Sequence, residues 1–178
     1  MEDNEELIAA KEEVAVMMAR ARAAQEQIAD YTQEQVNELI TAMVWSVGRE
    51  DRSEEIARLA IDETQLGNYA GKYLKIHRKT RATLMDIIGD KSVGVIEEIP
   101  ERNIVKIAKP VGVIGALSPS TNPEATPVIK AISAVKGRNA IIVAPHPRAK
   151  LTNKKICDYM REAIVLSLIP FPHPTRPY

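Results

Sequence analysis

The segment from residue 109 to residue 150 constrains the fold most, because its signals alternate between strand, turn and helix without interruption. Two apolar runs, 111–117 and 140–144, are typical of parallel strands that are covered on both faces. Between these runs, apolar residues recur at helical spacing, at Val128, Ala131, Ile132 and Val135. Gly137 supplies the expected end of this helix. The segment therefore predicts a nucleotide-type βαβ unit.

Each expected strand ends in a polar turn, residues 118–123 after the first and residues 145–148 after the second. An open α/β sheet binds its ligands at the carboxyl ends of its strands, so both turns are candidate sites. The first turn carries three hydroxyls and one amide ahead of a helix, where free N–H groups favour an oxyanion or a phosphate. In the structural alternative, Thr121 or Asn122 simply caps that helix, and Pro123 occupies its first position.

The second turn offers His146 and Arg148 as donors to a ribose or a phosphate, each next to a proline. The alternative is a rigid turn with a surface arginine and a half-exposed histidine.

The single cysteine, Cys157, lies inside an expected helix beside Asp158, which would disfavour a thiolate. We therefore expect a packed structural cysteine. Three scattered histidines and one cysteine give no metal-ligand spacing, so no metal site is expected.

Four helices are expected before any strand, over residues 5–28, 32–47, 54–66 and 73–88. Thr32 and Gln35 have the spacing of a capping box at the start of the second helix. One stripe of the first helix is expected to enter the core, and it consists of Val14, Met17, Met18 and Ala21. The basic segment around His77 is expected to form a solvated face, and it includes Lys75, Arg78, Lys79 and Arg81.

Residues 92–99 and 102–107 are rich in β-forming side chains, and Pro100 and Glu101 between them predict a hairpin. Charged residues on its flanks fit a solvated ribbon. An isolated two-stranded hairpin is marginal in water, however, so we expect this one to lie against another surface.

Composition and charge exclude several classes of protein. Lysine and arginine together number 24, as do aspartate and glutamate, so no basic surplus points to nucleic acid or an anionic membrane. No apolar run approaches the ~20 residues that a membrane span needs, and the acidic start is unlike a secretory signal. A single cysteine fits a reducing compartment. We expect a cytoplasmic protein with neither nucleic acid nor membrane as a partner.

Several motifs together resemble the aldehyde dehydrogenase superfamily, and in particular its CoA-acylating branch of acetaldehyde, succinate-semialdehyde and sulfoacetaldehyde type. The motifs are SPSTNP at 118–123, KGRN at 136–139, PHPRAK at 145–150 and ETQLG at 63–67. The resemblance implies an α/β, truncated aldehyde dehydrogenase fold, in which amino-terminal helices and a β-hairpin arm lead into the first half of a Rossmann-like parallel sheet. Its parts would be a helical layer (1–91), an oligomerisation arm (92–108), the first βαβ part (109–164) and an atypical Pro-rich tail (165–178).

The resemblance also implies NAD or NADP as cofactor, coenzyme A as co-substrate, a small aldehyde as substrate, and a homo-oligomer joined through residues 92–108. Hydrolytic relatives use an asparagine of the first turn to donate to the developing oxyanion. Aligned without a gap, Thr121 falls on that position and Asn122 one place later, so both are candidates. The candidate cofactor-binding residues are Ser118, Ser120, Pro145, His146, Pro147 and Arg148.

The reactive cysteine of the family would lie beyond residue 178. The resemblance therefore implies an amino-terminal fragment that is inactive alone. Two alternatives stay open, a non-catalytic nucleotide- or CoA-binding module and a pseudo-subunit of a full-length paralogue. The tail at 165–178 departs from the family pattern. It is interpreted either as an out-of-frame or truncated ending or as a genuine proline-rich docking segment.

Overall fold

The computed structural model describes residues 5–167 of the protein. The first half is helical and consists of α1 (Glu5–Gln27), α2 (Gln33–Gly48), α3 (Glu50–Thr64), α4 (Tyr69–Lys75), the π-helical η1 (Ile76–Thr80) and α5 (Arg81–Ile88). The second half consists of β1 (Gly94–Ile99), η2 (Pro100–Arg102), β2 (Ile104–Ala108), β3 (Val113–Ser118), α6 (Thr126–Lys136), β4 (Ala140–Pro145), η3 (Pro147–Ala149) and α7 (Lys150–Ser167). This order confirms the predicted sequence of helices, hairpin and βαβ unit. Most of the proline-rich tail, 168–178, lies outside the described residues.

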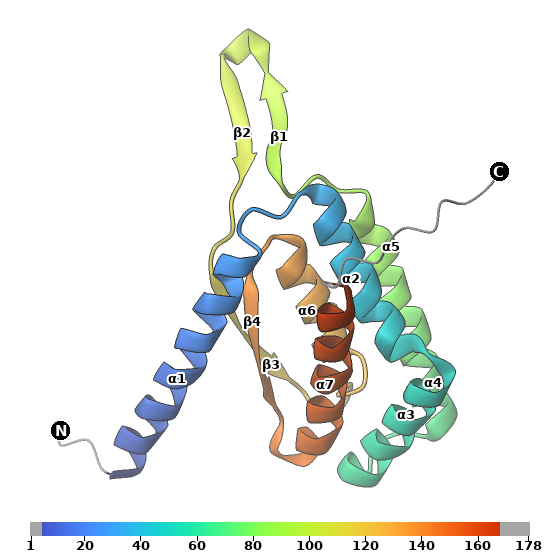
Figure 1. Ribbon diagram of the computed structural model, residues 1–178. Coiled ribbons are helices and arrows are strands. Elements are labelled where there is room, and N and C mark those ends of the chain that lie inside the picture. The colour runs from blue at the N-terminus through green and yellow to red at the C-terminus, as the bar shows by residue number, and fades with distance from the viewer. Residues whose placement is uncertain (1–4, 168–178) are drawn as a thin grey trace.

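The parallel strands β3 and β4, with α6 between them, form the predicted βαβ unit. Figure 1 shows α6 and α7 on one side of this strand pair and α1 on the other. The apolar runs predicted strands that are covered on both faces, and the structure departs from this prediction at the carboxyl ends of the strands. Leu117 is 78% exposed, and Ala144 is exposed as well. Within residues 5–167, β3 and β4 pair only with each other, and α1 does not extend over these ends.

Asn139 joins the end of α6 to the entrance of β3. Its Oδ1 accepts hydrogen bonds from the backbone N–H groups of Val111 and Gly112, at 2.7 and 3.0 Å. Its Nδ2 donates to the carbonyl of Ala134 at 3.2 Å. A Cβ on Gly137 would lie 2.8 Å from that nitrogen, so a glycine leaves the room that the amide needs. The KGRN motif thus sets how helix and strand meet.

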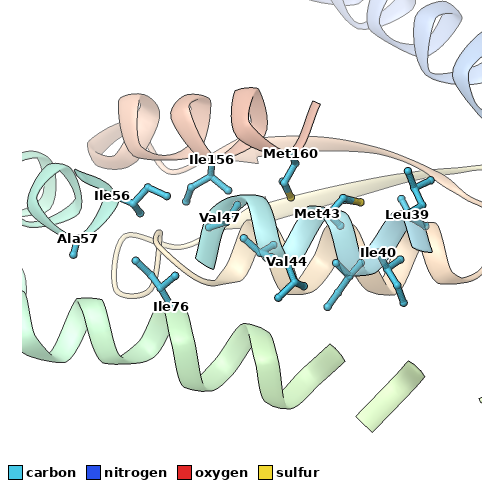
Figure 2. Packing of buried hydrophobic residues seen from close by; sticks show 14 residues of the cluster. Leu39, Ile40, Met43, Val44, Val47, Ile56, Ala57, Ile76, Ile156 and Met160 are labelled. Atoms are coloured by element: carbon cyan, nitrogen blue, oxygen red, sulfur yellow. The ribbon is translucent and has the colours of Figure 1, made fainter. Parts of the chain in front are cut away.

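The main core lies where α2 packs on α6 and α7. Figure 2 shows Met43 and Val47 of α2 beside Met160 and Ile156 of α7. The apolar stripe predicted for α6 is buried in full, and the capping box of Thr32 at the start of α2 is present. The buried cluster consists of Leu39, Ile40, Met43, Val44, Val47, Ile56, Ala57, Ile76, Val128, Ala131, Ile132, Val135, Ile156 and Met160.

Helix α1 differs from the prediction that its apolar stripe enters the core. Only Ala21 of that stripe is buried, Met17 and Met18 are half-buried, and Val14 is 52% exposed. Figure 1 shows α1 diverging from the β3–β4 pair toward its amino-terminal end, so the strands offer its first turns no surface to pack on. An apolar stripe requires a partner surface before it becomes core.

The hairpin of β1 and β2 projects from the body of the molecule (Figure 1). The strands are antiparallel, with a register irregularity between Val95 and Glu97, and Asn103 closes the turn in the left-handed conformation at φ 52°. Large apolar side chains on both strands are exposed, namely Val95, Ile96, Ile104, Val105 and Ile107. The expectation that this hairpin lies against another surface stays a prediction.

We expect Asn139→Ala to lower the free energy of unfolding by about 1–3 kcal/mol, because the N–H groups of Val111 and Gly112 then lose their acceptor. Ser133→Ala in α6 is the matched control, since the exposed Ser133 hydroxyl bonds only within its own helix, to Ile129 O. That control should change stability by less than about 0.5 kcal/mol. Urea unfolding followed by circular dichroism measures both, and equal midpoints would contradict the role given to Asn139.

Candidate functional site

The two polar turns lie side by side at the carboxyl end of the β3–β4 pair. Ser118 and Pro145 are the last paired residues of the strands, and the N–H of His146 donates to Ser118 O at 3.0 Å. Ser120 and His146 are half-buried, whereas Thr121, Pro147 and Arg148 are exposed. The structure therefore brings the two candidate sites together at one edge of the sheet.

Two lysines of α4 hold the first turn, although no local sequence pattern predicted this role for either of them. Lys72 is 2% exposed, and its Nζ donates to Thr121 O at 2.8 Å and to Glu124 Oε2 at 3.1 Å. Lys75 Nζ donates to Asn122 Oδ1 at 2.8 Å and lies 3.6 Å from Glu124 Oε1. The predicted solvated face is therefore wrong at Lys75, because these contacts tie it to the turn, whereas Arg78, Lys79 and Arg81 are exposed as predicted.

Glu124 is the buried counter-charge of this cluster. Its side chain is fully buried between the two ammonium groups of Lys72 and Lys75. A buried carboxylate is costly unless it is paired and hydrogen-bonded. The sequence signal for this arrangement is an acidic residue that follows Pro123 and precedes α6, whose apolar stripe faces the core. Its partner Lys72 lies 52 residues earlier, where local patterns cannot find it.

The alternative in which Thr121 or Asn122 caps the following helix is wrong. Helix α6 begins at Thr126, and its N-cap Ala125 makes no side-chain cap. Asn122 contributes only its backbone carbonyl, which accepts from the N–H of Thr126 at 3.1 Å. Its side chain is bound by Lys75 instead, so the amide belongs to the turn rather than to the helix cap.

Buried polar atoms without a hydrogen-bond partner gather around the first turn. Among the described residues these atoms include Ser118 Oγ, Glu124 Oε1 and Asn153 Oδ1. Asn153 comes from α7, and its Nδ2 donates to the carbonyl of Pro123 at 3.2 Å. Buried polar groups in proteins normally have a partner in protein or water. Of these three atoms, Glu124 Oε1 still faces an ammonium group, since Lys75 Nζ lies 3.6 Å away.

The second turn is anchored by the end of α3. Arg148 donates from one guanidinium nitrogen to the carbonyl of Thr64 at 2.8 Å. The Nδ1 of His146 accepts from the backbone N–H of Arg148 at 3.1 Å. Both candidate side chains therefore make structural contacts of the kind that the rigid-turn alternative describes. Arg148 is nevertheless exposed at the sheet edge.

Glu63 occupies the amino terminus of α7. Its carboxylate accepts from the N–H groups of Leu151 and Thr152, at 2.7 and 2.8 Å, and from the Thr152 hydroxyl at 2.8 Å. Burial alone would raise the pKa of Glu63, but the N–H groups of Thr152 and Leu151 bring it below its ordinary value. A carboxylate of the chain itself thus takes the place that a phosphate would occupy at this helix.

Cys157 is a packed structural cysteine, as predicted. It lies in α7, half-buried against the core cluster, and burial raises the pKa of its thiol.

His77 was expected to lie on a solvated face, and this expectation is wrong. Its Nε2 lies 3.0 Å from Ser53 Oγ, and its ring packs on Tyr73. Within residues 5–167, no group of three or more His, Cys, Asp or Glu side chains gathers that could hold a metal. The described helices include none with the length and apolarity of a membrane span.

Comparison with known proteins gives consistent matches. A sequence profile described as "Aldehyde dehydrogenase family" matches residues 7–170. A sulfoacetaldehyde dehydrogenase from Acholeplasma sp is 46% identical over 145 residues, which are 82% of this chain and 30% of that protein. A succinate-semialdehyde dehydrogenase (acetylating) from Clostridium kluyveri is 43% identical over 144 residues, or 81% of this chain and 31% of that protein. The chain therefore spans about a third of the length of these relatives.

Solved structures share the fold. An acetylating aldehyde dehydrogenase from Geobacillus thermoglucosidasius matches with a TM-score of 0.82 and 31% identity, over 92% of this chain and 36% of that one. A probable aldehyde dehydrogenase from Listeria monocytogenes EGD-e matches with a TM-score of 0.84 and 28% identity, over 89% of this chain and 35% of that one. The architecture described above thus recurs in these proteins over most of the present chain.

We expect Lys72→Met to lower the free energy of unfolding by about 3–5 kcal/mol, because Glu124 loses its closer ammonium while it stays buried. Adding Glu124→Gln should recover part of this loss, since it removes the unpaired charge. The exposed Lys154–Asp158 pair of α7 serves as the control, and Lys154→Met should cost less than about 1 kcal/mol. Chemical denaturation measures all variants. If Lys72→Met and Lys154→Met have equal effects, the buried pair is not a stabilising contact.

Proposed function

The chain belongs to the aldehyde dehydrogenase family, and we propose that it is the amino-terminal portion of a CoA-acylating, NAD(P)-dependent aldehyde dehydrogenase. The proposed reaction converts a small aldehyde, coenzyme A and oxidised NAD or NADP into an acyl-CoA and the reduced cofactor. Relatives whose names include "acetylating" or "acylating", at up to 43% identity, support this branch of the family.

The observation that carries the proposal is the first turn, residues 118–123, at the carboxyl end of β3. When a thiolate adds to an aldehyde, negative charge develops on the carbonyl oxygen, and a fixed donor stabilises that charge. The hydroxyl of Thr121 and the amide of Asn122 are the candidate donors. The turn that carries them is held in place by the buried Lys72–Glu124 pair, which supports a preorganised site.

The same sheet edge is the proposed binding site for the adenine nucleotide part of the cofactor, which NAD(P) and coenzyme A have in common. Leu117 gives an exposed apolar surface, and Ser118 Oγ is a buried hydroxyl without a partner among the described residues. Bound NAD(P) supplies the hydride acceptor of the reaction. Because Glu63 occupies the start of α7, the first turn is the better place for phosphate. The residues proposed to hold the cofactor are Ser118, Ser120, Pro145, His146, Pro147 and Arg148.

The nucleophile of the reaction is not Cys157. Its thiol packs against the core, and burial raises its pKa despite the opposing charge of Arg161, which disfavours the thiolate that the reaction needs. Cys157 is the single cysteine of the sequence, so we propose that the chain is inactive alone. The exposed apolar side chains of the hairpin support a second proposal, that residues 92–108 join subunits of a homo-oligomer in the cytoplasm.

The purified chain should not reduce NAD or NADP when acetaldehyde, succinate semialdehyde or sulfoacetaldehyde is added with coenzyme A. The reason is that hydride transfer requires a thiolate adduct, and Cys157 does not supply one. Absorbance at the reduced-cofactor band measures the reaction, with Cys157→Ala as the matched variant. Activity in the natural chain that disappears in Cys157→Ala would contradict both the proposed inactivity and the structural role of this cysteine.

A chimera tests the proposed function directly. The 145-residue segment of this chain that matches the sulfoacetaldehyde dehydrogenase from Acholeplasma sp replaces its counterpart in that enzyme. We expect the chimera to oxidise sulfoacetaldehyde and to transfer the acyl group to coenzyme A, because the turns and their supporting lysines provide the same part of the site. A chimera that folds but does not oxidise the aldehyde would favour a non-catalytic binding module instead.

A further inference from the structure

We propose that Lys75 is a positioning residue that makes Asn122, rather than Thr121, the hydrogen-bond donor of the first turn. This inference rests on the function proposed above. It concerns a residue of α4, a helix that lies outside the turn and carries none of the candidate site residues. Lys75 acts through Asn122 and has no direct role in the chemistry.

The contact between the two side chains fixes the orientation of the Asn122 amide. Lys75 Nζ lies 2.8 Å from Asn122 Oδ1. An ammonium group has three donors and no acceptor, so the amide atom that faces it must be the oxygen. Nδ2 therefore points away from Lys75. Its contact with Thr121 Oγ1, at 3.5 Å, is long for a hydrogen bond, so the amide N–H groups keep their capacity for a stronger acceptor.

Thr121 is less suited to the role of donor. Its side chain is exposed, and the bond that holds the residue in place goes to its backbone carbonyl, from Lys72. The hydroxyl hydrogen rotates to suit its surroundings. A donor contributes most to catalysis when its direction is set before charge develops. The Asn122 amide meets this condition because Lys75 holds its other end.

Lys75 is itself held by the buried part of the cluster. Its ammonium lies 3.6 Å from Glu124 Oε1, and Glu124 is fixed in turn by Lys72 at 3.1 Å. Two ammonium groups against one carboxylate leave one excess positive charge beneath the turn. This charge polarises the Asn122 amide and strengthens its N–H groups as donors. The same charge favours an oxyanion above the turn.

The first experiment uses the full chain and needs no activity. The two side-chain N–H signals of Asn122 are assigned in ¹⁵N spectra by their loss in Asn122→Ala. In Lys75→Met, we expect these signals to shift toward those of exposed asparagines and their order parameter to fall. Lys75→Arg should keep the order parameter high, because it keeps a cationic donor. Lys79→Met, which replaces an exposed lysine four residues further along the chain, should leave the signals unchanged.

Asn122 signals that are the same in Lys75→Met as in the natural chain would overturn the inference. Because the Lys75 side chain is 41% exposed, its replacement should leave the remaining spectrum intact. A spectrum changed throughout would also overturn the inference, since Lys75 would then be a general structural residue. Neither result depends on the proposed enzymatic function.

The second experiment uses the active chimera and a double-mutant cycle. Asn122→Ala should lower kcat by about 10²–10³-fold, as expected for the loss of one oxyanion donor. Lys75→Met should lower kcat by about tenfold with little change in KM, and should have no further effect once Asn122 is alanine. Lys75→Arg should restore most of the activity.

Independent, multiplicative effects of Lys75→Met and Asn122→Ala would overturn the inference and leave the proposed function standing. A larger loss in Thr121→Ala than in Asn122→Ala would do the same. If the unmutated chimera folds but has no activity, the proposed function fails, whereas the Asn122 signals of the chain still decide whether Lys75 orients the amide.

Discussion

The buried carboxylate of Glu124 is the constraint on which the site depends. A fully buried negative charge must be matched by a positive one, and the match comes from Lys72, which is 2% exposed. The same ammonium binds the carbonyl of Thr121, so charge pairing and loop shape are set by one side chain. The helical layer and the βαβ unit are thereby joined at the point where the candidate chemistry lies. Loss of either charge alone would be more costly than loss of both.

Local sequence patterns predicted the parts of the fold that depend on interactions between residues close together in the chain. The buried stripe of α6 and the capping box at Thr32 follow from helical spacing and from a cap that spans three residues. The stripe of α1 has the same kind of pattern, yet Val14 is exposed. A stripe indicates which face of a helix is apolar but not which surface covers it. Which surface covers the stripe depends on the position of β3 and β4, and α1 diverges from these strands toward its amino-terminal end.

The position of the candidate site was predictable, whereas its internal contacts were not. Turns that follow parallel strands must meet at one edge, and the pairing of Ser118 with Pro145 confirms this. An Asn-Pro pair before a helix is equally typical of a cap and of a functional turn, so the role of Asn122 depended on Lys75, a distant residue. The contacts of Arg148 and Glu63 were equally unpredictable from local sequence, because the backbone groups that they bind belong to segments more than 80 residues away.

The strand pair β3–β4 has one further consequence, which concerns the time before the fold is complete. Each of these strands has one edge that carries no ladder hydrogen bonds to another strand within the described residues. Unpaired strand edges are templates for backbone pairing with any extended segment, whatever its side chains. During synthesis, strand pairing within one molecule therefore competes with strand pairing between neighbouring molecules. A higher protein concentration favours pairing between molecules over pairing within one molecule.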